Sequence, residues 1–196
     1  MEIKNSKFLK SITKLEDKPV GDVPEIAFVG KSNVGKSSLI NNLLAHKIAK
    51  TSSAPGRTRL INYFAVNNDT LRFVDLPGYG YNLASKQISN EWDNMIGKFL
   101  LDNPNLKLVI FLVDCRHNPT NLDKQTQKFL YNNGIPFLTV ATKTDKIAKS
   151  KVNNQLFLVA KELMISKSNI IAYSVENNTG KANLLEKIDT ILENIC

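Results

Sequence analysis

The sequence has few features of secreted or membrane proteins. Only two of its 196 residues are cysteines, Cys115 and Cys196, and their spacing matches no metal-binding pattern. No apolar run approaches the roughly 20 residues of a membrane helix, and residues 1–18 lack the apolar stretch of a secretory signal. Two isolated thiols fit a reducing compartment. We therefore expect a cytoplasmic protein, with Cys115 as a buried free thiol at the end of an apolar run.

Internal repeats and low-complexity segments are also absent. The chain is 42% hydrophobic and 22% charged, which is ordinary for a globular protein, and its length suits one domain better than two. We expect a single domain over residues 23–196, preceded by a basic extension, residues 1–22, that adds a strand or a helix along it. The net charge of +8 leaves two interpretations open: a solvated lysine-rich surface, or affinity for a polyanion such as RNA.

From residue 25 onward, apolar strands alternate with helical patterns. A hairpin joins two of the strands, and the others have the order of a parallel sheet, so the pattern predicts an α/β fold. We expect a mostly parallel six-stranded sheet with one antiparallel edge strand and helices on both faces. The predicted strands are 25–29, 61–66, 71–74, 106–113, 136–141 and 170–173, and the predicted helices are 38–45, 85–101, 120–132, 152–163 and 184–195.

Four polar stretches follow the predicted strands: 30–37, 75–78, 142–145 and 174–176. Ligands of such sheets bind at the carboxyl ends of the strands. All four stretches therefore belong to the edge at which a ligand is expected.

The stretch 30–37 has the form G-x-x-x-x-G-K-S between a strand and a helix, as in a phosphate-binding loop. Its glycines let backbone N–H groups point at phosphate oxygens, and the helix N-terminus adds partial positive charge. Lys36 is expected to reach the β- and γ-phosphates of a nucleotide, and Ser37 to ligate Mg²⁺. The predicted phosphate site comprises Gly30, Lys31, Ser32, Asn33, Val34, Gly35, Lys36, Ser37 and Ser38.

A second motif, Asp75-Leu76-Pro77-Gly78, ends the strand 71–74. A carboxylate at Asp75 can hold Mg²⁺ through a water molecule. The backbone N–H of Gly78 can touch the γ-phosphate, where a side chain would block the approach. The pattern predicts that all four residues lie at the nucleotide and that Asp75 takes part in the metal site.

A third motif, Thr142-Lys143-Thr144-Asp145, follows the strand 136–141. Guanine presents N1–H and N2–H₂ as adjacent donors, and one carboxylate accepts both. Adenine has no such pair and would leave the Asp145 carboxylate unpaired. Lys143 can pack its stem along the base and bond the phosphate loop with its ammonium group. The motif therefore predicts a guanine nucleotide, GTP or GDP.

From Pro24 to Ile195 the chain resembles the translation-factor-like GTPases, which share the Ras-type fold. Three strings are similar to those of the EngB family, also called YihA or YsxC: P-E-I-A-F-V-G-K-S-N-V-G-K-S-S-L-I-N at 24–41, P-G-R-T at 55–58 and D-L-P-G-Y-G-Y at 75–81. The resemblance implies that Gly56, Arg57 and Thr58 belong to the first switch, with the Thr58 hydroxyl as a ligand of Mg²⁺ in the GTP state.

The resemblance also identifies Ser174, Val175 and Glu176 as the remaining guanine motif. Glu176 departs from the small or basic residue more usual there, so only the backbone N–H groups are expected to meet the guanine carbonyl oxygen.

Two further positions bear on hydrolysis. Tyr79 stands where Ras and its relatives carry the glutamine that orients the attacking water, so we expect slow intrinsic hydrolysis that a partner or a monovalent cation stimulates. In related GTPases an asparagine at the position of Asn33 coordinates potassium, which would stabilise negative charge as an arginine finger does. The residues expected to carry hydrolysis are therefore Lys36, Thr58, Gly78 and Asn33.

The resemblance implies a GTPase switch that acts in late assembly of the large ribosomal subunit and in division septum formation. We expect a monomer. Its expected partners are GTP, GDP and a precursor of that subunit, through RNA or protein. A cell-division or signalling GTPase that acts only through proteins, with no direct RNA contact, remains an alternative. A P-loop kinase is a third reading, and the guanine motif argues against it.

Overall fold

The computed structural model describes residues 1–46, 49, 60–80 and 95–195. The predictions for Gly56, Arg57 and Thr58 and for the first part of the helix 85–101 lie outside these residues, whereas residues 95–102 are helical. The strands are β1 (Ser6–Ile12), β2 (Glu25–Gly30), β3 (Ile61–Val66), β4 (Leu71–Asp75), β5 (Leu106–Asp114), β6 (Phe137–Thr142) and β7 (Ile170–Ala172). The labelled α-helices are α1 (Lys36–Leu44), α3 (Asn121–Asn132), α4 (Lys149–Glu162) and α5 (Lys181–Ile195), and short 3₁₀ turns lie at Leu15–Asp17, Thr144–Lys146 and Lys167–Asn169.

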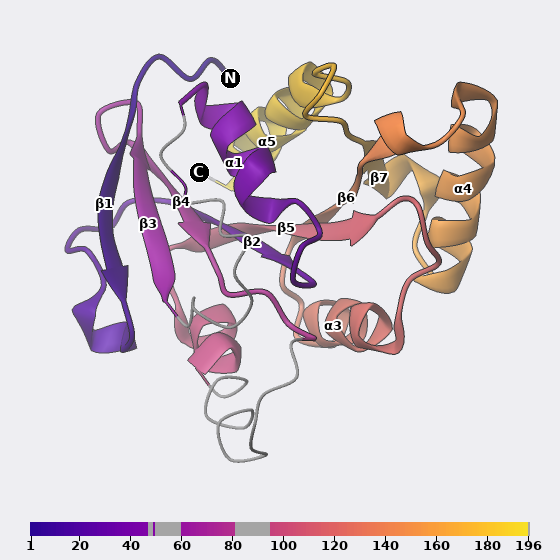
Figure 1. Cartoon of the computed structure of the whole chain (residues 1–196). Coiled ribbons are helices and arrows are strands. Elements are labelled where there is room, and N and C mark those ends of the chain that lie inside the picture. The colour runs from indigo at the N-terminus through magenta and orange to yellow at the C-terminus, as the bar shows by residue number, and fades with distance from the viewer. Residues whose placement is uncertain (47–48, 50–59, 81–94, 196) are drawn as a thin grey trace.

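The described strands form one sheet in the order β1-β3-β4-β2-β5-β6-β7 (Figure 1). β3 pairs antiparallel with both β1 and β4, and every other pair is parallel. The predicted fold class is confirmed. The predicted number of strands was wrong, because the sheet has seven strands within the described residues and not six. The additional strand, β1, lies outside β3 at the edge and comes from the N-terminal 22 residues.

The sequence of β1 hides its strand character because its side chains do not alternate. The register with β3 shifts between Phe8 and Lys10, so Leu9 and Ile12, three residues apart, both pack on the core. Phe8 instead meets Phe64 of β3 edge-to-face, with ring centroids 5.8 Å apart. A bulge at an edge strand breaks the period of two that identifies a strand in a sequence.

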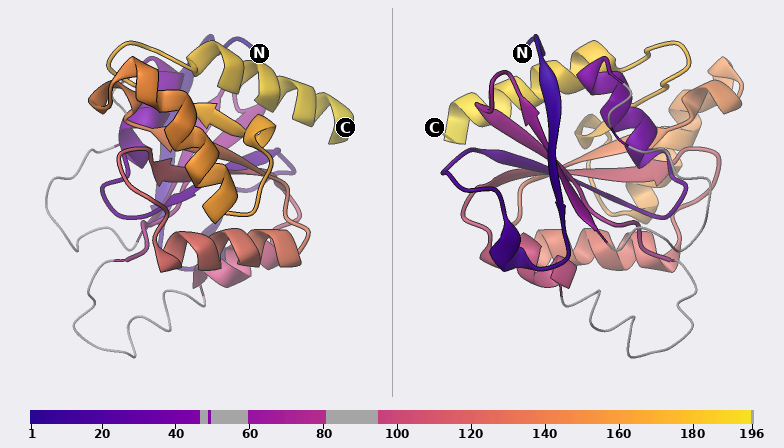
Figure 2. Two further views of the ribbon diagram at one scale, coloured as in Figure 1. Left: turned by 90° about the vertical axis from the view of Figure 1, so that its right-hand side faces the viewer. Right: turned by 60° about the vertical axis from the view of Figure 1, so that its left-hand side comes forward.

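Helices cover both faces of the sheet, as the alternation predicted (Figure 2). Along β5, Leu108, Ile110 and Leu112 face the core shared with α1 and α5. Val109, Phe111 and Val113 face the core shared with residues 95–102, α3 and α4. Since all six side chains are buried, β5 reads as a continuous apolar run. Cys115, directly after β5, is buried and unpaired as expected.

Two local features set the boundaries of these elements. Thr120 and Asp123 form a capping box that starts α3. The hairpin between β3 and β4 turns through Asn67, Asn68 and Asp69, all three with positive φ, a conformation that asparagine and aspartate tolerate better than most residues.

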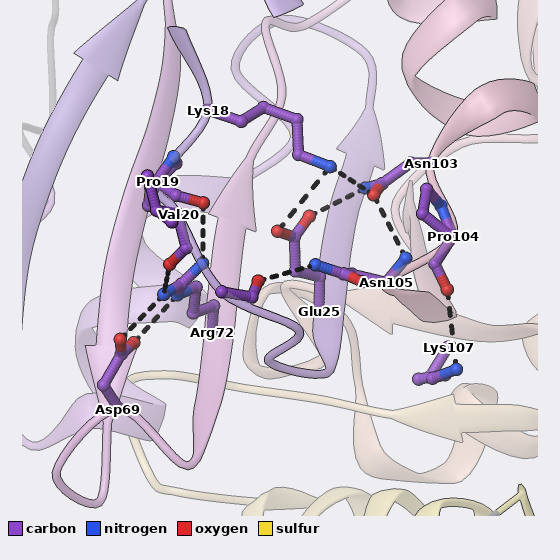
Figure 3. A network of polar contacts seen from close by, with 11 residues as sticks. Lys18, Pro19, Val20, Glu25, Asp69, Arg72, Asn103, Pro104, Asn105 and Lys107 are labelled. Atoms are coloured by element: carbon purple, nitrogen blue, oxygen red, sulfur yellow. Dashed lines mark hydrogen bonds and ion pairs between the residues drawn. The ribbon is translucent and has the colours of Figure 1, made fainter. Parts of the chain in front are cut away.

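At the amino ends of β2 and β4, a buried polar network fastens the N-terminal segment to the sheet (Figure 3). Arg72 is 2% exposed and donates to the carbonyl oxygens of Pro19 and Val20, at 3.0 and 2.8 Å, and to both carboxylate oxygens of Asp69. Glu25 is fully buried, accepts from Asn103 at 2.7 Å and pairs with Lys18 at 3.9 Å.

Candidate nucleotide-binding site

The phosphate loop connects β2 to α1, as predicted. A Cβ on Gly30 would lie 2.9 Å from Val34 Cγ1 and 3.0 Å from the carbonyl oxygen of Leu112, so a side chain there would displace the neighbouring strand. Asn33 and Gly35 have φ of 65° and 102°, which turn the chain into the helix. Because Gly35 is the N-cap of α1, no cap side chain competes for the N–H groups of the first turn, where Ser37 and Ser38 lie.

Asp75 ends β4 beside this loop, since β4 pairs with β2 up to Phe28. Its two carboxylate oxygens contact Lys36 Nζ in an ion pair and Ser37 Oγ at 3.3 Å. A hydroxyl and a carboxylate at this separation are the oxygen ligands that Mg²⁺ takes from protein in nucleotide sites, with phosphates and water completing the shell. The residues present therefore fit a magnesium ion.

Gly78 is packed directly against the phosphate loop. A Cβ at Gly78 would lie 3.0 Å from both Cα and N of Ser32. The next residue, Tyr79, accepts from Ser32 N at 2.9 Å and donates its own N–H to the Gly30 oxygen at 3.2 Å. Leu76 and Pro77, buried between Asp75 and Gly78, complete the connection. Only a residue without a side chain fits this approach.

The predicted guanine motif lies next to the loop, at the end of β6. Thr142 Oγ1 donates to the carbonyl oxygen of Val34 at 2.7 Å. Lys143, with φ of 60°, donates from Nζ to the carbonyl oxygen of Asn33 at 2.7 Å, which is the contact with the phosphate loop that the sequence predicted. Thr144 Oγ1 donates to the Tyr173 oxygen and so joins the end of β6 to the end of β7.

The carboxylate of Asp145 is held by two donors. Ser174 Oγ donates to Asp145 Oδ1 at 2.8 Å, and Lys146 Nζ lies 3.0 Å from Oδ2. The hydrogen bond from Ser174, followed by that from Lys146, lowers the pKa of Asp145 below its ordinary value, so this group is an anionic acceptor at neutral pH. Val175 and Glu176, which follow Ser174, are exposed.

Asp114, at the end of β5, is a site residue that the sequence analysis missed. It pairs with Lys143 Nζ at 2.9 Å and with two nitrogens of Arg116 at 2.9 and 2.8 Å. Partial burial raises its pKa, but the hydrogen bonds from Arg116 and Lys143 outweigh burial and hold the pKa below the ordinary range. Its position at a strand end was the available signal, and its partners follow only from the fold.

A pocket of about 220 Å³ adjoins these residues. It lies between the phosphate-loop residues 31–34, the turn 116–120 and Lys143. Lys31, Ser32, Asn33 and Val34 thus line a pocket at the same edge of the sheet as Asp75 and Asp145. Within the described residues, no helix has the length and apolar character needed to cross a membrane.

Comparison with known proteins agrees with this geometry. Residues 25–143 match the model of a protein family described as "50S ribosome-binding GTPase". A "Probable GTP-binding protein EngB" from Pelotomaculum thermopropionicum is 46% identical over 190 residues, which are 96% of each chain. The protein of the same name from Clostridium perfringens strain 13 is 42% identical over 198 residues, which span both chains completely.

Solved structures give the same result. The crystal structure of a probable GTP-binding protein engB superposes with a TM-score of 0.72 at 25% identity and covers 87% of this chain and 99% of that one. Aquifex aeolicus Era bound to GDP·AlF₄⁻ gives 0.67 at 27% identity and covers 87% and 56%. With the phosphate loop, the Asp75–Gly78 segment and the guanine motif at one edge of the sheet, this chain belongs to the EngB family of GTP-binding GTPases.

Proposed function

We propose that this protein is a GTP-hydrolysing switch that acts on the assembling large ribosomal subunit and is needed for normal cell division. The observation that carries the nucleotide part is the meeting of Lys36, Asp75, Lys143 and Asp145 at one edge of the sheet, through the contacts described above. Lys36 and Asp75 can hold the phosphates and their metal ion there, and Lys143 and Asp145 can hold the base.

In the proposed mechanism, Lys36 and the N–H groups of the loop 30–38 bind the β- and γ-phosphates. Ser37, Asp75 and Thr58 would hold Mg²⁺, which would supply positive charge against the phosphate oxygens. The backbone N–H of Gly78 contacts the γ-phosphate, and release of that contact together with that of Thr58 ends the GTP state. Thr58, with Gly56 and Arg57, enters this proposal from the sequence alone.

The base is recognised by Asp145, which accepts from guanine N1–H and N2–H₂, while the stem of Lys143 packs along the ring. Thr142 and Thr144 fix the strand end. The backbone of Ser174, Val175 and Glu176 meets the carbonyl oxygen of the base.

Asn33 is the proposed ligand of a potassium ion that speeds hydrolysis, because Tyr79 stands in place of the water-orienting glutamine. Turnover in saturating K⁺ should exceed turnover in saturating Na⁺, and the Asn33→Ala variant should lose that difference. Equal rates in the two salts would remove potassium from the mechanism.

The ribosomal part of the proposal rests on charge and on relatives. The net charge of +8 suits contact with RNA. Era, one of the similar structures, was solved with MgGDPNP and nucleotides 1506–1542 of 16S ribosomal RNA. We propose a cytoplasmic monomer, residues 23–196 being its GTPase domain, whose partner is a precursor of the large subunit. A cell-division switch that binds only proteins is the second candidate.

Co-sedimentation with ribosomal particles separates these candidates. We expect the protein to pellet with large-subunit precursors when a nonhydrolysable GTP analogue is present and to be released with GDP. The association should weaken steeply with salt, since RNA contacts release counterions. Binding that is absent in both nucleotide states, or that is insensitive to salt, would favour the protein-only candidate.

A further inference from the structure

The side chain of Tyr79 joins the segment after Gly78 to helix α3. Its hydroxyl donates to Asp123 Oδ1 at 2.6 Å, and its ring packs on the core beneath α3. The neighbouring Gly80 lies close to the same helix, because a Cβ there would lie 3.3 Å from Leu122 Cδ1. In Ras the water-orienting glutamine occupies the position of Tyr79. In this chain the side chain at that position is hydrogen-bonded to α3.

Asp123 is well fixed as the acceptor of this bond. It is 5% exposed, and its second oxygen, Oδ2, accepts from both N and Oγ1 of Thr120 at 2.7 Å. Burial, then the charge of Asp123, raises the pKa of Tyr79 well above its ordinary range. The phenol therefore stays protonated at neutral pH and acts as the donor, and charge-assisted bonds of this kind are among the strong ones.

The backbone shows what this bond holds in place. Phe28 of β2 pairs with Asp75 of β4, and the pairing resumes at Lys31 and Tyr79. Two residues separate Phe28 from Lys31, whereas three separate Asp75 from Tyr79. The segment after β4 therefore bulges, and Gly78 lies in this bulge against Ser32. Asp75 anchors one side of the bulge, and Tyr79 anchors the other.

We propose that Asp123 is a positioning residue for GTP, because it fixes through the Tyr79 hydroxyl the place of the Gly78 N–H beside the phosphate loop. Asp123 acts through Tyr79 and touches no nucleotide. This inference rests on the proposed GTPase function and deepens it. In the proposed mechanism the Gly78 N–H contacts only the γ-phosphate. The hydrogen bond between Tyr79 and Asp123 therefore strengthens the binding of GTP and leaves the binding of GDP unchanged.

The test compares Tyr79→Phe with Tyr131→Phe, which changes an exposed tyrosine on α3 in the same way. For Tyr79→Phe we expect GDP affinity within about twofold of the parent, and affinity for a nonhydrolysable GTP analogue lowered about tenfold, the loss typical of one hydrogen bond to a charged group. Turnover should fall by a similar factor. Tyr131→Phe should match the parent in all three measurements.

Asp123→Asn tests whether both residues act through one contact. It should lower the ratio of GTP-analogue to GDP affinity in the same direction, and adding Tyr79→Phe to it should lower that ratio no further. Thermal melting of each variant shows that it is folded. A purely structural role would lower both affinities alike or neither, and would leave their ratio unchanged.

Two results overturn the inference. One is a Tyr79→Phe variant that matches Tyr131→Phe in GTP-analogue affinity and turnover. The other is an equal loss of GDP and GTP-analogue affinity. A parent protein that binds neither nucleotide would differ from both results and would overturn the proposed function as well.

Discussion

The carboxyl and the amino edge of the sheet both carry buried or partly buried charges, but the partners of these charges differ. At the carboxyl edge, charged side chains pair with one another across loops: Lys36 with Asp75, and Lys143 with Asp114. At the amino edge, Arg72 binds backbone carbonyl oxygens and a turn aspartate, and Glu25 binds Asn103 (Figure 3).

The two edges differ in whether a ligand can take the place of a charged side chain's partner. A phosphate or a base can replace one partner of a side-chain pair in a glycine-rich loop, and the pair reforms when it leaves. The carbonyl partners of Arg72 belong to the N-terminal segment, and their hydrogen bonds to Arg72 hold this segment on the sheet. Removing these hydrogen bonds would therefore release the segment from the sheet. Burial of charge alone therefore does not identify a binding site, and the nature of the partners does.

The largest expected effect is at Lys36. Lys36→Ala removes the cation that the β- and γ-phosphates need, and titration with a fluorescent GDP should give an affinity lower by about a thousandfold or more. Lys128→Ala, an exposed lysine on α3, is the matched control and should bind as the parent does. Nucleotide affinity retained in Lys36→Ala would place the phosphates elsewhere.

The next effect is on base recognition. Asp145→Asn puts an amide donor where guanine N2–H₂ needs an acceptor, so GDP affinity should fall by about a hundredfold or more. IDP lacks the 2-amino group and should bind the parent more weakly than GDP. The preference for GDP over IDP should disappear in the variant. A preference that survives Asp145→Asn would assign the recognition of the amino group to another residue.

The amino edge should respond in stability and leave binding unchanged. Arg72→Met leaves the carbonyl oxygens of Pro19 and Val20 without their donor, and urea unfolding should give a loss of roughly 3 kcal/mol. Lys10→Met, at an exposed lysine of β1, should cost far less. The affinity of folded Arg72→Met for GDP should equal that of the parent. A large fall in this affinity would contradict the claim that the amino edge contributes to stability and not to nucleotide binding.

The smallest effect is the pH dependence at Glu25. Burial raises its pKa above the ordinary 4.5, although the hydrogen bond from Asn103 and the charges of Lys18 and Arg72 act against burial. The folded state thus holds this proton more tightly than the unfolded chain, and ionisation costs stability as the pH rises from about 4.5 through the raised pKa.

Glu25→Gln lacks this loss, so its stability relative to the parent should improve between the pH where glutamate ordinarily ionises and neutrality. Urea unfolding at a series of pH values measures the trend. Glu16→Gln, at an exposed glutamate, should run parallel to the parent. A Glu25→Gln profile that is also parallel would mean that Glu25 is solvated in the folded state.

Much of the carboxyl edge could be predicted because its motifs are local. A loop such as 30–37 or 142–145 encodes its chemistry in consecutive residues, and the alternation of strands and helices brings such loops together. The roles of Asp114 and Asp123 depend on Lys143 and Tyr79, which are distant from them in the sequence, so no local pattern reports these contacts.

The network at the amino edge could not be predicted, and the choice between a strand and a helix for the extension stayed open, for related reasons. Glu25 and Arg72 look like ordinary strand-end charges, and only the folded segment around Pro19 buries them. β1 lacks alternation because of its bulge. At both places the tertiary context decides, and local propensity does not.

The central claim, that the carboxyl edge is a guanine-nucleotide site, is tested most directly by competition. A fluorescent GDP bound to the protein should be displaced by GDP at a concentration about a hundredfold or more below that needed for ADP, since only guanine satisfies Asp145. Displacement by ADP and GDP at equal concentrations would contradict the account.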